Sequence, residues 1–272
     1  MSKRLRDLLQ RARAERRPLF FPYVTGGYPT PADTVPILLA LEAGGADVIE
    51  LGVPFTDPLA DGATIQHANH VAVAQGVTLE DCLGYVSAAR REGLTAPVLL
   101  MGYYNPILAV GEERAAALAQ ASGADGFIVV DLPPEEAGSF LAACRAHDQS
   151  FVPLVAPTSS DARIEKLAAV ADAFLYCVSV TGTTGQRSAM PAELPQFLER
   201  VRRHTNLPLA VGFGITTRAH VEAVGRIADA AIIGSAIIGA IDAAGGASPA
   251  ASVREFTENV TGRQRAGGHG PS

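Results

Sequence analysis

Eight short apolar runs, separated by stretches with helical patterning, constrain the fold more than any other feature of this sequence. The runs occupy residues 19–25, 47–51, 97–101, 126–131, 150–155, 173–179, 208–213 and 230–234. Each is short, nearly all apolar and often β-branched, as expected for parallel strands covered on both faces. The alternation of strands and helices predicts an α/β fold.

Several helix starts can be read between these runs. Thr78 is followed three residues later by Asp81, a variant of the capping box. Prolines and glutamates at 133–136 predict another start, because acids are favourable at the positive end of the helix dipole. Further starts are predicted at Thr30-Pro31, Thr64, Ser160, Thr217 and Ser248-Pro249.

Eight strands that alternate with helices form either a doubly wound sheet or a closed barrel. Gly26 and Gly27 lack the glycine spacing of a dinucleotide-binding sheet, and no ribose-binding acid follows them. The length of 272 residues fits a barrel. We therefore predict a (β/α)8 TIM barrel as a single domain over residues 1–262, with an extra N-terminal helix across one end and a disordered tail at 263–272.

Composition excludes several classes of function. The formal net charge is -6 and no long basic stretch occurs, so nucleic-acid binding is not expected. No run reaches about 18 uninterrupted apolar residues, which excludes a membrane-spanning helix. Three widely spaced cysteines favour a reducing, cytoplasmic setting. The basic N-terminal segment also resembles an organelle transit peptide, but a surface helix is the plainer interpretation.

The stretch ELGVPFTDPLADGATIQ, residues 50–66, places an acid where the second apolar run ends. Side chains alternate along a strand, so Glu50 shares a face with Val48. If that face is the barrel interior, Glu50 loses solvation, its pKa rises, and it can act as both acid and base near neutral pH. The alternative is a surface acid at a strand end.

The loop that follows is shaped by two prolines. Pro54 and Pro58 each fix one backbone φ angle and favour extended conformations in the preceding residues. The loop therefore holds Asp57 and Asp61 above the predicted barrel. One of the two aspartates could instead serve only to form a turn, and the pattern does not decide which.

Two glycine-containing loops predict a phosphate site. Gly212 and Gly214 follow the seventh run, and Gly234-Ser235 follow the eighth, directly before a short apolar helix. Glycines let backbone N–H groups approach an anion, and barrels often bind phosphate between these two loops. Glycines that only permit close packing are the alternative. The loop at 179–191 is long, and such a loop can close as a lid. The alternative is a loop that is only a flexible connection.

The motifs FPYVTGGYP, ELGVPFTDPLADGATIQ, MGYYNPIL, VTGTTG, VGFGI and IGSAI, in this order, resemble the α subunit of tryptophan synthase over nearly the whole chain. The resemblance implies a (β/α)8 barrel that cleaves indole-3-glycerol phosphate to indole and glyceraldehyde 3-phosphate by a retro-aldol reaction. It implies that Glu50 is the general acid/base. Asp61 would accept a hydrogen bond from the indole N–H, and Tyr176 would lie beside the acid/base.

The same resemblance implies the substrate-binding residues. The phosphate would be held at Gly185, Gly214, Gly234 and Ser235, with Phe213 adjacent. Thr184 would order Asp61 when the lid closes.

The resemblance also implies a partner, a tryptophan synthase β subunit in an α2β2 assembly. That subunit carries pyridoxal phosphate and would contact the loop around Asp57 and the segment at Asn105-Pro106. We expect no cofactor and no metal in this chain itself, and we interpret His67 and His70 as solvated helix residues.

Two positions depart from the family pattern. Ala63 stands where a proline is usual, and Val180 where many members have a polar or basic residue. Both put coupling to the partner in doubt more than the chemistry, so a stand-alone lyase that releases free indole and a mainly regulatory subunit remain alternatives. A related synthase barrel would use lysines at strand ends, whereas this chain has only Lys3 and Lys166, away from them.

Overall fold

The computed structural model describes residues 1–178, 191–212, 214–245 and 248–263. Its strands are β1 (Leu19–Thr25), β2 (Ile49–Gly52), β3 (Val98–Gly102), β4 (Gly126–Val129), β5 (Ser150–Val152), β6 (Leu154–Val155), β7 (Leu175–Val178), β8 (Leu209–Gly212) and β9 (Ala230–Ile233). Its α-helices are α1 (Lys3–Glu15), α2 (Thr34–Ala43), α3 (Ala63–Ala74), α4 (Leu79–Arg91), α5 (Tyr104–Val110), α6 (Glu112–Ser122), α7 (Gly138–Ala146), α8 (Asp161–Val170), α9 (Leu194–Arg202), α10 (Arg218–Gly225), α11 (Ser235–Asp242) and α12 (Pro249–Thr261).

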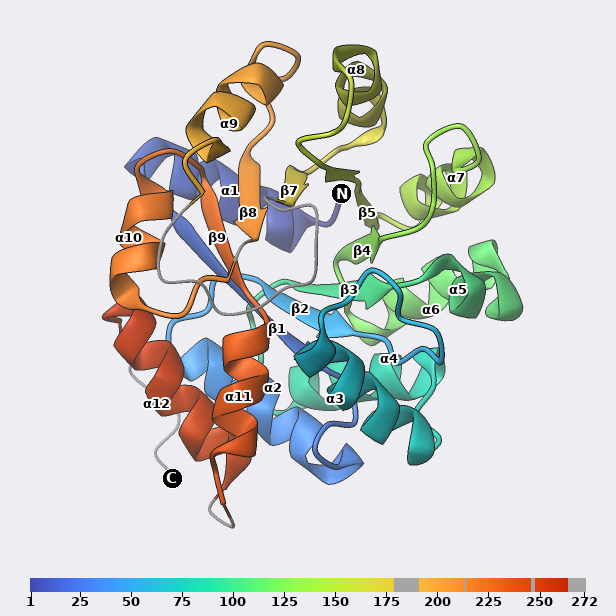
Figure 1. Ribbon diagram of the computed structural model, residues 1–272. Coiled ribbons are helices and arrows are strands. Elements are labelled where there is room, and N and C mark those ends of the chain that lie inside the picture. The colour runs from blue at the N-terminus through green and yellow to red at the C-terminus, as the bar shows by residue number, and fades with distance from the viewer. Residues whose placement is uncertain (179–190, 213, 246–247, 264–272) are drawn as a thin grey trace.

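The strands form a parallel sheet in the order β5-β4-β3-β2-β1-β9-β8-β7-β6, with helices around the outside (Figure 1). β5 and β6 lie at opposite ends of this order, yet only Pro153 separates them in the chain. The barrel therefore closes through one segment, which confirms the predicted (β/α)8 barrel. The single strand predicted at 150–155 is interrupted because Pro153 has no N–H to donate to a ladder.

Inward-facing side chains alternate with outward-facing ones and fill the barrel. Phe21, Val48 and Phe174 belong to the interior cluster, and Leu5 and Leu8 of α1 pack against it. The predicted N-terminal helix across one end of the barrel is thus confirmed. A larger cluster fills the space between the strands and the outer helices.

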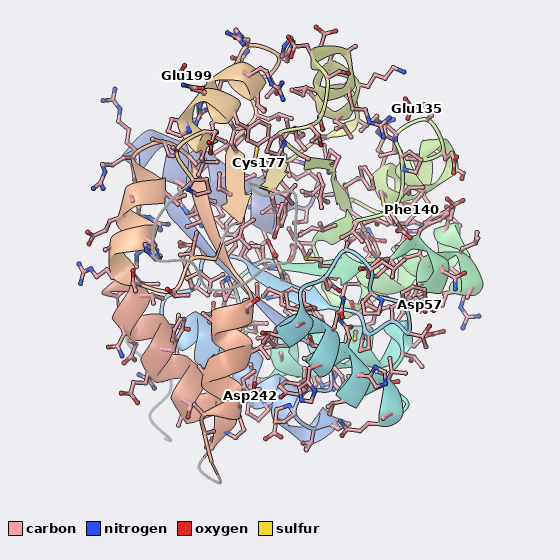
Figure 2. All side chains as sticks on the ribbon, viewed as in Figure 1. Asp57, Glu135, Phe140, Cys177, Glu199 and Asp242 are labelled. Atoms are coloured by element: carbon pink, nitrogen blue, oxygen red, sulfur yellow. The ribbon has the colours of Figure 1, made fainter. Side chains whose placement is uncertain are left out.

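In that outer layer, Phe140 of α7 (Figure 2) makes edge contacts with two strand residues. Its ring centroid lies 5.1 Å from that of Phe127 in β4 and 6.2 Å from that of Phe151 in β5. Such aromatic pairs hold a helix against the barrel wall through buried area and edge-to-face geometry.

Helix caps follow the sequence in part. The capping box of Thr78 and Asp81 is present, and the caps at Ser160, Thr217 and Ser248 are confirmed. Thr30 precedes a single 3-10 turn, and its hydroxyl bonds the Asp33 carboxylate rather than a backbone N–H.

Two predicted helix starts are wrong. Residues 134–136 form a turn, and α7 begins only at Gly138. The Glu135 carboxylate pairs with Arg163 and Lys166 of α8, so its charge serves a contact between elements and not the start of a helix. Thr64 lies inside α3, whose N-cap is Gly62. Among the described helices, none is long and apolar enough to cross a membrane.

Candidate active site

Glu50 lies in β2, opposite Tyr23 of β1 and Leu99 of β3, and its side chain is fully buried. Neither carboxylate oxygen has a hydrogen-bond partner among the described residues. Burial without compensation disfavours the charged form and raises the pKa of Glu50 well above its usual value. The predictions of an inward-facing Glu50 and of a raised pKa are both confirmed.

Two buried tyrosines, Tyr176 and Tyr23, lie close enough to Glu50 and Asp61 for both acids to affect their ionisation. Burial and the charges of these two acids raise the pKa of Tyr176 in β7 and of Tyr23 in β1. Tyr176 belongs to the interior cluster together with Phe174, as the alternation predicts. Tyr23 was not singled out from the sequence, although its alternate position to Phe21 in β1 indicates the same inward face.

Glycines make room for the two phenol groups. A Cβ at Gly52 would clash with the Tyr23 hydroxyl, and one at Gly212 would lie 3.0 Å from the Tyr176 hydroxyl. Any larger residue at Gly52 would displace Tyr23. These two glycines at the ends of β2 and β8 therefore allow both hydroxyls to occupy the mouth of the barrel.

Asp61 is held in the loop before α3 by side chains from two other elements. Its Oδ2 accepts from Asn69 Nδ2 at 3.3 Å and, more weakly, from the Tyr103 hydroxyl at 3.5 Å. Burial raises the pKa of Asp61 to about 6, and the Tyr103 hydrogen bond partly opposes that rise. Asp57, by contrast, is exposed and accepts from Thr56 Oγ1 at 3.0 Å. Of the two aspartates left open by the sequence, Asp61 is the half-buried one and Asp57 the exposed one.

Tyr103 supports this loop as a whole. Its hydroxyl accepts from the Ala60 N–H at 2.9 Å, and its ring stacks on Phe55 with centroids 5.0 Å apart. Sequence reasoning missed Tyr103 and Asn69 because both act across 8 or more positions. A polar residue directly after β3, at the carboxyl end of a barrel strand, was the available signal.

The two glycine loops leave the barrel from neighbouring strands. β8 and β9 are parallel, with Gly212 opposite Ile232. Gly234 is the N-cap of α11 and Ser235 its first residue, so backbone N–H groups at this helix start are available to an anion. Gly214, Gly234 and Ser235 are all partly exposed. Phe213, Thr184 and Gly185 lie outside the described residues.

Within the described part of the chain, no group of three or more His, Cys, Asp or Glu side chains is arranged to hold a metal. His67 makes an edge contact with Tyr28, with ring centroids 6.1 Å apart.

The family model of the tryptophan synthase alpha chain matches residues 9–266, nearly the whole sequence.

The chain belongs to the tryptophan synthase alpha chain family.

Individual relatives agree with this assignment. The tryptophan synthase alpha chain of Roseiflexus sp. strain RS-1 is 49% identical over 259 residues, which cover 95% of this chain and 99% of the relative. The tryptophan synthase of Saccharomyces cerevisiae is 51% identical over 239 residues, but these span only 34% of that longer protein.

Solved structures agree as well. The tryptophan synthase of Mycobacterium tuberculosis superposes with a TM-score of 0.88 at 33% identity, covering 98% of this chain and 100% of that chain. The tryptophan synthase subunit alpha of Legionella pneumophila str. Paris gives a TM-score of 0.85 at 34% identity, covering 97% and 100%. As a member of this family, the chain is a carbon–carbon lyase of tryptophan biosynthesis that cleaves indole-3-glycerol phosphate.

Proposed function

We propose that Glu50 is the general acid/base of this cleavage. The observation that carries the proposal is a fully buried carboxyl group with no hydrogen-bond partner among the described residues and a strongly raised pKa. Burial favours the protonated form of such a group, which can then donate its proton to carbon 3 of the indole ring. After a base takes the proton of the glycerol hydroxyl, the carbon–carbon bond breaks to give indole and glyceraldehyde 3-phosphate.

Asp61 is proposed to stabilise the positive charge on the protonated ring by accepting the indole N–H. With a pKa of about 6, Asp61 is mostly ionised at neutral pH, whereas burial raises the pKa of Glu50 well above its usual value. Two acids whose environments separate their pKa values can divide the roles of proton donor and countercharge. Tyr103 and Asn69 fix the Asp61 carboxylate before substrate binds, which is electrostatic preorganisation. Tyr176 is proposed to lie beside Glu50; its place in the interior cluster and the effect of Glu50 on its pKa support this.

The phosphate of the substrate is proposed to bind at Gly214, Gly234 and Ser235, together with Gly185 and Phe213. The start of α11 and the adjacent loop after β8 support this arrangement, because they offer backbone N–H groups and a hydroxyl. Thr184 is proposed to meet Asp61 when the segment 179–191 closes over the site.

A β subunit that carries pyridoxal phosphate is the proposed partner, in an α2β2 assembly. Leu59 and Leu108 support this: they are the large hydrophobic side chains most open to solvent in the described chain, 89% and 56% exposed. Leu59 lies in the Asp57 loop, and Leu108 lies in α5 with Asn105 and Pro106. Exposed apolar residues at the same two segments are typical of a protein contact.

The cysteines and the packing of the two terminal helices bear on the cellular setting and the domain organisation. We place the chain in the cytoplasm, since Cys82, Cys144 and Cys177 are all free and buried. We also take residues 1–262 as one domain, because α1 packs on the barrel interior and α12 on the outer layer.

The chemistry is tested by assaying indole release from indole-3-glycerol phosphate by wild type and the variant Glu50→Gln. We expect kcat to fall by roughly 10²–10⁴-fold, the usual contribution of a positioned acid/base. Glu199→Gln is the matched control, since Glu199 is exposed on the outer face of α9 (Figure 2). Unchanged activity in Glu50→Gln would remove Glu50 from the mechanism.

The partnership is tested by adding β subunit in increasing ratio. We expect indole release to rise to a plateau at equimolar mixing. Leu108→Lys should weaken this activation, whereas Ala142→Lys on the exposed face of α7 should not. No enhancement of wild type at any ratio would instead favour a stand-alone lyase.

A further inference from the structure

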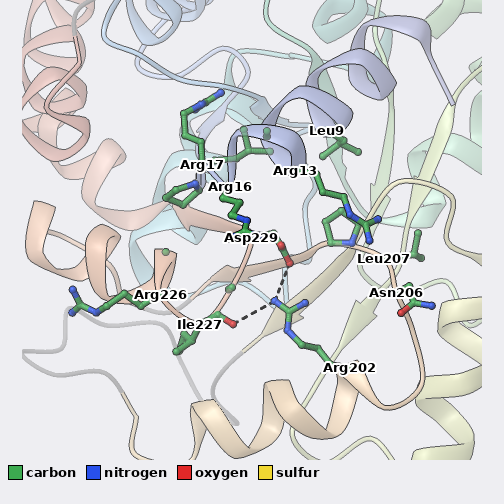
Figure 3. Close-up of a pocket in the computed structure, with 16 residues that line it drawn as sticks. Leu9, Arg13, Arg16, Arg17, Arg202, Asn206, Leu207, Arg226, Ile227 and Asp229 are labelled. Carbon is green, nitrogen blue, oxygen red and sulfur yellow. Dashed lines mark hydrogen bonds and ion pairs between the residues drawn. The ribbon is translucent and has the colours of Figure 1, made fainter.

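A cavity of about 440 Å³ opens beside the segments that precede β1, β8 and β9 (Figure 3). It therefore lies at the amino end of the barrel, whereas the candidate active site lies at the carboxyl end. The walls of the cavity are the last turns of α1, the segment Arg16–Leu19, and the residues that precede β8 and β9, at 206–208 and 225–229. This volume lies in the range of small-molecule sites.

The cavity is strongly cationic although the chain as a whole is acidic. The formal net charge of the chain is -6. The lining nevertheless holds one carboxylate, Asp229, and five arginines, which are Arg13, Arg16, Arg17, Arg202 and Arg226. The sign of the charge here is therefore opposite to that of the average surface.

Internal ion pairs account for only two of these arginines. Arg202 Nη2 donates to Asp229 Oδ2 at 3.0 Å and lies 3.4 Å from the Ile227 carbonyl oxygen (Figure 3). Arg17 pairs with Asp47 at 2.9 Å. Asp229 is further engaged by the Leu209 N–H at 2.8 Å. For the other three guanidinium groups, the described residues supply no carboxylate partner.

Arg16 is also unusual in its backbone. It ends α1 with φ 50° and ψ 37°, the left-handed conformation in which helices usually place glycine. Glycine would adopt this conformation more easily, so the role of the residue in ending the helix does not explain why it is an arginine. Its side chain is exposed at the cavity rim, as is that of Arg13 one turn earlier.

Apart from Asn206 and Gly225, apolar side chains line the rest of the wall. Leu9 comes from α1, Leu207 from the segment before β8, and Ile227 from the segment before β9. A ligand in this cavity would thus meet cations and hydrocarbon together.

We propose that this cavity binds a small phosphate-bearing molecule with an apolar body, as a second anion site separate from the phosphate site at α11. Guanidinium groups present planar N–H pairs that match phosphate oxygens, and they hold the full positive charge at any physiological pH. The site at α11 uses neutral groups at the other end of the barrel, so the two differ in chemistry and place. A ligand bound in the cavity contacts both α1 and the segments before β8 and β9. Because it binds the folded chain, it stabilises that state.

The test is a titration of the full chain with phenyl phosphate and, separately, with inorganic phosphate, followed by amide chemical shifts. We expect one set of shifts at 13–19, 206–209 and 225–229, distinct from any at Gly214, Gly234 and Ser235. We expect phenyl phosphate to bind the amino end more tightly than inorganic phosphate, and binding to weaken at high ionic strength.

The variant pair Arg13→Gln/Arg16→Gln should weaken binding at the amino end by roughly tenfold or more, the loss expected for two charge-assisted contacts. The matched pair Arg114→Gln/Arg145→Gln removes the same charge from exposed positions on α6 and α7 and should leave the affinity unchanged. Indole release should be unchanged in both.

Three results would overturn the proposal. They are shifts confined to the carboxyl end, an equal loss of affinity in both variant pairs, or binding at the amino end of an acidic peptide or an oligonucleotide but of neither phosphate.

Discussion

The two ends of this barrel treat buried carboxylates in opposite ways. At the amino end, Asp125 is fully buried, and its oxygens accept from Ser2 Oγ at 2.5 Å, Arg4 Nη1 at 2.8 Å, Arg90 Nη2 at 3.0 Å and the Val98 N–H at 2.8 Å. At the carboxyl end, Glu50 is equally buried and neither oxygen has such a partner in the described chain.

Asp47 repeats the pattern of Asp125. It pairs with Arg17 at 2.9 Å and with Arg263 at 2.7 Å, and it accepts from the Phe20 N–H at 2.9 Å. These paired acids tie the N-terminal segment and the end of α12 to the strand starts. The same chemical group thus stabilises the fold at one end, whereas at the other end its desolvation is retained for proton transfer.

The largest effect on stability is expected at the paired end. Asp125→Asn removes the charge that compensates Arg4 and Arg90, and breaking a buried ion pair costs about 3–5 kcal/mol. Denaturant unfolding measures the loss, and kcat of the folded fraction should be unchanged.

The matched control for Asp125→Asn is Glu222→Gln, which breaks an exposed pair with Arg218 on one helix. Such pairs contribute about 0.3–0.5 kcal/mol. If Asp125→Asn cost no more than this control, the contrast between the two ends would be lost.

Glu50→Leu should act in the opposite direction. It replaces a buried unpaired carboxyl group by hydrocarbon of similar size, which is expected to raise the free energy of unfolding by about 1–3 kcal/mol while abolishing indole release. Asp125→Leu, by contrast, should destabilise. Destabilisation by both substitutions would mean that Glu50 has partners in the folded state that stabilise it.

Asp61 is expected to make the free energy of unfolding depend on pH. A carboxyl whose pKa is raised from 3.8 to about 6 binds its proton more tightly in the folded chain, so stability falls as pH rises through this range and stays lower above it. At pH 8, the free energy of unfolding of Asp61→Asn should therefore exceed that of wild type by about 1–2 kcal/mol, after allowance for the partial exposure of the carboxyl group. Below about pH 4 the two should not differ. A difference that is constant with pH would contradict the raised pKa.

The sequence predicted the features that depend on local periodicity. Alternation in the second apolar run was enough to turn Glu50 inward with Val48, and spacing was enough to find the capping box at Thr78. Prediction from the sequence failed where a contact with a residue far away in the chain determines the local structure. Glu135 pairs with α8 instead of starting a helix. The division of the run at 150–155 has a local cause instead, because Pro153 cannot donate to a ladder.

The supports of the site were hidden for the same reason. Tyr103 contacts Asp61 across 42 positions, and Asn69 contacts it across 8. The position of Tyr103 directly after β3 places it at the carboxyl end of the barrel, but no local pattern shows that it contacts Asp61. Periodicity therefore predicts which face of a strand or helix a residue lies on. Which residues it contacts on that face depends on how the barrel closes.

The smallest effect concerns the stiffness of the carboxyl-end loop. Ala63 is the first residue of α3, and Gly62 before it is extended at φ -77° and ψ 164°, so both positions suit a proline at 63. Ala63→Pro should raise the free energy of unfolding by about 0.4–1 kcal/mol. Ala68→Pro in the middle of the same helix is the control and should cost about 3 kcal/mol or more.

The central claim, an inward Glu50 held in its protonated form by desolvation, is tested most directly by titrating its side-chain carboxyl carbon by NMR in the full chain. The account predicts a transition well above the usual value of 4.5, lowered toward normal in a variant that lets water in, such as Leu99→Ala. A transition at or below 4.5 in the wild-type chain would contradict it.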